Sequence, residues 1–90
     1  MGGPGLEYKE LIRKFLQGFI SASEFRDLYI EKFKGESRVL DEDLFFLLDE
    51  LYGDADMYSE DVLLINKNPG VYLDETMLRS KARLVFSRIA

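Results

Sequence analysis

The segment between residues 41 and 56 constrains the fold of this chain most strongly. Four of its apolar residues recur at the spacing i, i+3, i+4 and i+7: Leu44, Leu47, Leu48 and Leu51. This spacing places them on one face of an α-helix, which turns by about 100° per residue. We predict an amphipathic helix that Asp41 caps and that ends at Gly53, where a left-handed residue can close it.

The opposite face of this helix is acidic. Four carboxylates gather there: Glu42, Asp43, Asp49 and Glu50. Phe46 falls in their middle, where a core-facing helix needs no aromatic side chain. Asp54 and Asp56 follow just past the predicted helix end, where the helix dipole disfavours negative charge. The candidate binding residues are therefore Asp49, Glu50, Asp54, Asp56, Phe46, Glu42 and Asp43.

Negative charge is concentrated around this helix. Residues 36–61 carry ten acidic residues and one basic residue, a net charge of −9, whereas the whole chain has a net charge of −5. A concentrated acidic patch steers a basic protein towards it and repels nucleic acid. The pattern therefore favours a basic protein partner and no direct nucleic-acid binding, although it also fits a solvated face that only keeps the protein soluble.

Three further segments have helical periodicity. We predict helices over residues 6–17, 22–34 and 75–89, with their apolar stripes facing inward. Ser21 and Glu24 match a capping box at the start of the second helix, and Asp74 can cap the last one. The expected fold is all-α, a small antiparallel four-helix bundle with a long loop between helices three and four. Residues 1–5 are expected to be a flexible leader, and residues 6–90 a single domain.

The predicted loop over residues 54–73 is long for a compact domain, and loops of this length are often functional. Its apolar run, residues 62–65, is expected to cover part of the core, either as a short helical turn or as an extended piece. Gly18, between the first two helices, is a good stop signal for the first.

The composition excludes much enzyme chemistry. The chain has no His and no Cys, so the usual nucleophile–base pairs cannot form. Its carboxylates lie on a predicted open helix face, without an apolar pocket that would separate their pKa values. We expect no enzyme activity and no cofactor. An EF-hand loop counted from Asp54 fails at Ser59 and Ile65, which leaves only a weak, nonspecific divalent-cation site open.

No apolar run approaches the roughly 18 residues that a membrane span needs, so no membrane partner is expected. The absence of Cys is compatible with a cytoplasmic location, which we expect.

Three stretches together resemble a known family. The first is FLQGFISASEF at residues 15–25; the second is Leu44-Phe45 followed by Asp49 and by GDAD at residues 53–56; the third is LDETMLR at residues 73–79. In their order and spacing, over about residues 8–89, they resemble the colicin D-type immunity proteins. These are small four-helix proteins that bacteria make against their own toxins, including those of contact-dependent growth inhibition.

The resemblance implies a function. Members of that family bind the nuclease domain of a toxin and cover its active site, and the colicin D domain cuts tRNA in the anticodon loop. By position, Asp49, Asp54 and Asp56 would lie where RNA phosphates lie, and helix geometry adds Glu50 and Phe46. The expected partner is a basic nuclease domain bound by a monomer in a 1:1 complex. The segment from residue 60 to residue 72 departs from the family pattern, and we expect toxin specificity there.

Other interpretations remain open. The chain could be a helical adaptor that binds a basic protein without inhibiting it, or a dimer formed through Phe46. Phe46 could instead pack beneath the loop, and Asp54 and Asp56 could only shape a turn. Arg79 has most simply a structural role, although it could face Asp54 or Asp56 across the bundle.

Overall fold

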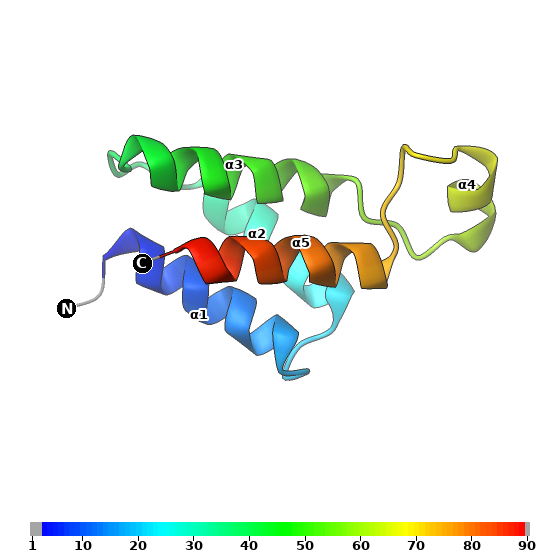
Figure 1. The fold of residues 1–90 in the computed structure, drawn as a ribbon, viewed down its shortest axis with the longest axis horizontal. Coiled ribbons are helices and arrows are strands. Elements are labelled where there is room, and N and C mark those ends of the chain that lie inside the picture. The colour runs from blue at the N-terminus through cyan, green and yellow to red at the C-terminus, as the bar shows by residue number, and fades with distance from the viewer. Residues whose placement is uncertain (1–2, 90) are drawn as a thin grey trace.

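Five helices make up the computed structural model, which describes residues 3–89. They are α1 (Pro4–Leu16), α2 (Ala22–Lys34), α3 (Glu42–Asp56), α4 (Val62–Lys67) and α5 (Glu75–Arg88), as Figure 1 shows. Over the described residues there is no strand, only an isolated bridge between Tyr58 and Leu73. The all-α prediction is confirmed. Among residues 3–89, no helix is both long and apolar enough to cross a membrane.

The four long helices enclose one core. α1 packs against α2 and α5, and α3 packs against the same two helices from the other side. The largest fully buried side chains come from all four: Tyr8, Ile12, Phe15, Phe25, Tyr29, Leu48, Leu51 and Leu78. The apolar stripes of the helices face inward as predicted, except that Leu28, which the periodicity places in the inward stripe of α2, is exposed. α3 is thus fixed along its inner side by two neighbours and leaves its outer side free.

The helix ends largely follow the predicted caps. Gly18 takes a left-handed conformation with φ 82° after α1, and the capping box of Ser21 and Glu24 is present at α2. Asp41 and Asp74 accept backbone hydrogen bonds at the starts of α3 and α5. α1 begins at Pro4 rather than at Leu6, so the helix includes two residues of the predicted leader; residues 1 and 2 lie outside the described range.

The predicted end of α3 is wrong. Gly53 does not close the helix; its φ is not positive, and α3 continues to Asp56 with Met57 at its C-cap. The reason is packing, because Ala55 and Tyr58 are buried in the core and hold the extra turn in place. Asp54 and Asp56 therefore lie in the last turn of α3 rather than in a loop beyond it.

The predicted long loop contains a short helix that covers no core. α4 has no buried residue, and Val62 and Leu63 are exposed, so the expectation that residues 62–65 cover the core is wrong. In Figure 1, α4 stands apart from the four long helices at one end of the molecule. Val62 and Leu63 face solvent, whereas Leu64 and Ile65 are half-buried without joining the core cluster.

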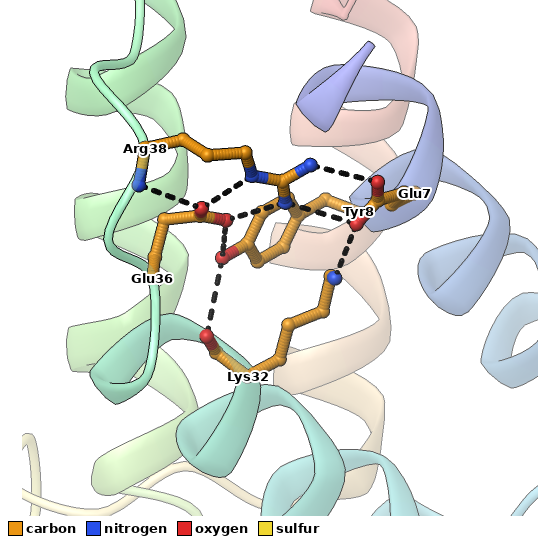
Figure 2. Close-up of polar contacts among 5 residues, drawn as sticks. All are labelled: Glu7, Tyr8, Lys32, Glu36 and Arg38. Carbon is orange, nitrogen blue, oxygen red and sulfur yellow. Dashed lines mark hydrogen bonds and ion pairs between the residues drawn. The ribbon is translucent and has the colours of Figure 1, made fainter. Parts of the chain in front are cut away.

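Figure 2 shows a polar cluster that consists of five side chains: Glu7, Tyr8, Lys32, Glu36 and Arg38. Arg38 donates to Glu7 at 2.8 Å and to Glu36 at 2.7 Å, and Lys32 donates to Glu7 at 2.7 Å. The Tyr8 hydroxyl donates to Glu36 at 2.9 Å. These contacts join α1, α2 and the connection that leads into α3.

Candidate functional site

All seven predicted binding residues lie on the outer side of α3. Six of them are exposed, and Asp54 is partly buried. We call this set the acidic face: Glu42, Asp43, Phe46, Asp49, Glu50, Asp54 and Asp56. Since the residues belong to one regular helix packed on both flanks, the fold presents them as a fixed array.

One row of carboxylates follows the α2 side of the acidic face. Glu42, Asp49 and Asp56 are seven residues apart, so they lie nearly in line at intervals of about 10 Å. This row lies on the α2 side because Phe45, on the same flank of α3, contacts Phe33 of α2. The two ring centroids are 6.0 Å apart.

A second row follows the α5 side and consists of Asp43, Glu50 and Asp54. At one end of this row, Asp43 lines an open cleft of about 380 Å³ together with Arg88 of α5. At the other end, the positive charge of Lys81 acts on Asp54. Sequence reasoning missed this cleft, because its walls come from α1, α3 and α5 and no single segment reveals it.

Asp54 differs from the open carboxylate that the sequence predicts. Partial burial raises its pKa above the ordinary value and the nearby Glu50 raises it further, while Lys81 opposes the shift. A carboxylate that is already partly desolvated loses less hydration when a partner covers it. Asp54 is therefore the member of the acidic face best prepared to form a buried ion pair.

No carboxylate of the acidic face forms an ion pair within residues 3–89. Among residues 3–89, every ion pair uses other carboxylates: those of Glu7, Glu10, Asp27, Glu36 and Glu75. Six carboxylates on one helix without an ion pair leave a negative field directed outward. Such a surface can bind cationic side chains of another protein.

Phe46 is 58% exposed between the two rows. Its ring meets that of Phe45 edge to face, with 6.0 Å between the centroids, and Phe45 in turn contacts Phe33. Phe46 thus packs on α3 itself and not beneath the loop that follows the helix. It offers apolar area at the centre of a charged surface, which is where interface anchors are typically found.

Arg79 has a structural role. Its guanidinium pairs with Glu75 at 3.0 Å and donates to the main-chain oxygen of Phe15 at 2.9 Å. The group also lies over the Phe15 ring, 4.5 Å from its centroid. Arg79 therefore holds the end of α1 against α5 and does not pair with Asp54 or Asp56.

No group of three or more potential metal-ligating side chains is present within residues 3–89. The rows of the acidic face explain this, since neighbouring carboxylates on an exposed helix diverge. The arrangement suits several separate cationic groups better than one shared ion.

Comparison with known proteins assigns the family. Residues 5–89 match the family described as bacterial self-protective colicin-like immunity. The chain belongs to this family and is thus a protein that neutralises a toxin by binding it, an inhibitor rather than an enzyme. No curated protein and no solved structure gives a significant match.

Proposed function

We propose that the chain inhibits the nuclease domain of a cognate bacterial toxin by covering its RNA-binding site with the acidic face. The observation that carries the proposal is the array of six carboxylates without an ion pair around an exposed Phe46. A site that cleaves RNA must hold phosphates with basic groups, and carboxylates can bind those same groups.

The resemblance to the colicin D-type proteins supports a tRNA-cleaving toxin. In this proposal the four long helices act as an antiparallel bundle that holds α3 rigid. Asp49 and Asp54, one from each row, pair with Lys or Arg side chains near the toxin's catalytic centre. Asp56, Glu50, Glu42 and Asp43 extend the negative field and speed the encounter.

Phe46 supplies the apolar contact between the rows. Excluding water there strengthens the surrounding ion pairs, because the local dielectric constant falls. The complex contains one copy of each protein, and the inhibitor acts as a monomer in the cytoplasm, where it protects the cell that makes the toxin.

A protection assay tests this function. The toxin domain encoded beside this chain is incubated with total tRNA while the chain is added in increasing amounts. We expect cleavage to stop near one equivalent. Binding that leaves cleavage intact would instead favour a non-inhibitory adaptor or an exosite, and a lack of binding would contradict the proposal.

A further inference from the structure

α4 exposes two large apolar side chains at one end of the molecule. Val62 is 65% exposed and Leu63 is 71% exposed, and neither packs on the core. They are part of a wider pattern, since five of the twelve exposed large hydrophobic residues of the described chain lie between residues 57 and 77. Apolar area gathered in one region of a soluble protein typically marks an interaction site.

Local hydrogen bonds nevertheless hold α4 in a defined conformation. The Asp61 side chain accepts from the backbone amides of Leu63 at 3.0 Å and Leu64 at 3.2 Å. The Asn68 side chain donates to the main-chain oxygen of Leu64 at 3.0 Å. The two exposed residues are therefore presented from a capped helical turn rather than from an irregular loop.

The base of this segment is fixed to the rest of the fold. The backbone amide of Leu73 donates to the Met57 oxygen at 2.9 Å, and that of Ser59 donates to the Leu73 oxygen at 3.0 Å. Ser23 of α2 donates to Glu60. Because Met57 directly follows Asp56, this base continues from the last turn of the acidic face.

The charges around Val62 and Leu63 indicate which kind of partner would bind these two residues. Glu60 and Asp61 directly precede the apolar pair, and Asp56 ends α3, whereas Lys67 is the basic residue of α4. A second copy of the chain would bring two acidic borders together, and an anionic membrane would be repelled by them. A protein surface with an apolar depression and basic groups at its edge fits both features.

We propose that Val62 and Leu63 form a second, apolar contact with the toxin domain that the acidic face binds. This contact rests on the proposed function, because it requires that toxin as the partner. It adds affinity chiefly by slowing dissociation, since burial of apolar area is short-ranged and does not steer the encounter. It also gives a means of selecting one toxin, because the acidic face fits any basic site.

The experiment compares the double variant Val62→Gln with Leu63→Gln against the control Val39→Gln. Val39 is 99% exposed and lies in the connection that precedes α3, away from α4. Both variants should unfold like the wild type, because the replaced side chains are exposed. Calorimetric titration with the toxin domain encoded beside this chain should show affinity about 30-fold lower for the double variant and unchanged for the control.

Salt concentration provides an independent readout. Raising it should weaken binding through the acidic face but leave the ratio between wild type and double variant unchanged, because apolar contacts are not screened. Wild-type and double-variant affinities within twofold of each other would overturn the α4 contact while leaving the proposed function standing. If the wild type does not bind the toxin domain, both proposals fail. A wild-type dimer that the double variant abolishes would assign α4 to a second copy and overturn the contact.

Discussion

The polar cluster and the acidic face are both built from carboxylates, yet the fold treats them in opposite ways. In the polar cluster, Arg38 and Lys32 satisfy Glu7 and Glu36, whose pKa values fall to about 2. The largest cause in both cases is the hydrogen bond from Arg38. On the acidic face no carboxylate has such a partner within residues 3–89, and the pKa of Asp54 moves upward instead.

This difference separates charges that serve the fold from charges that serve a partner. The polar cluster joins three segments of the chain and so fixes the connection that leads into α3. The acidic face joins nothing, and two of its members lie at the helix C-terminus where the dipole opposes them. Removing its charges should therefore weaken binding without destabilising the fold, whereas removing those of the polar cluster should destabilise the fold without weakening binding.

The largest expected effect comes from the double variant Asp49→Asn with Asp54→Asn. Each replacement leaves a toxin cation without its partner, and losing one member of a buried pair costs about 2–5 kcal/mol. We expect toxin affinity to fall by at least about 10³-fold. The matched control is Glu10→Gln with Glu31→Gln, which removes two exposed charges from α1 and α2. Equal losses in both double variants would show that only net charge matters.

Phe46→Ala should have the next largest effect. Burying most of an aromatic ring contributes about 2 kcal/mol, so toxin affinity should fall by roughly 30-fold. Phe19→Ala is the control, because Phe19 is equally large and is exposed in the connection after α1. Thermal unfolding should change little in either variant. A Phe46→Ala protein that unfolds much earlier but binds normally would place Phe46 among the structural residues.

Arg38→Ala should lower the unfolding temperature at pH 7 by several degrees and leave toxin binding unchanged. Glu7 and Glu36 have folded-state pKa values of about 2, below the ordinary 4.5. Their stabilising contribution is therefore full above pH 4.5 and is lost as the pH falls towards 2. Melting curves across this pH range should show that the difference in unfolding temperature between Arg38→Ala and wild type shrinks as the pH falls. Arg83→Ala is the control, because Arg83 of α5 is exposed. A difference in unfolding temperature between Arg38→Ala and wild type that does not change with pH would contradict the ion-pair explanation.

The smallest expected effect is a gain in stability from Asp54→Asn. Burial raises the folded-state pKa of Asp54, so its ionised form is less favourable in the folded protein at neutral pH. Removing the charge, which also opposes the helix dipole, should add about 0.3–1 kcal/mol to the free energy of unfolding. Chemical denaturation measures this gain, which should vanish below pH 3.8 as Asp54 is protonated in both states. A loss of stability would mean that Asp54 serves the fold.

Much of the fold could be predicted from local patterns. The apolar spacing identified the four long helices, and the caps at Ser21, Asp41 and Asp74 marked three of their starts. The acidic side of α3 and the exposure of Phe46 also followed from helix geometry, because a single helix fixes both. The family resemblance was confirmed at the level of colicin-like immunity.

Features that depend on distant contacts could not be predicted in this way. Gly53 is a good stop signal locally, but burial of Ala55 and Tyr58 extends α3 beyond it. The run Val62–Ile65 has the composition of core residues, yet it lies in α4, which contributes no buried residue, and its spacing alone does not reveal this. In the polar cluster, Arg38 contacts Glu7, which is 31 positions away in the sequence. The periodicity of residues along the chain does not indicate contacts between residues so far apart in sequence.

The most direct test of the account is a competition between this protein and RNA for the toxin domain. A catalytically inactive toxin domain is saturated with a fluorescent tRNA anticodon stem-loop, and the protein is then added. If the acidic face occupies the RNA-binding site, the apparent affinity for RNA falls in proportion to the added protein, and no complex contains all three molecules. A stable ternary complex, with RNA still bound at its original affinity, would contradict the account.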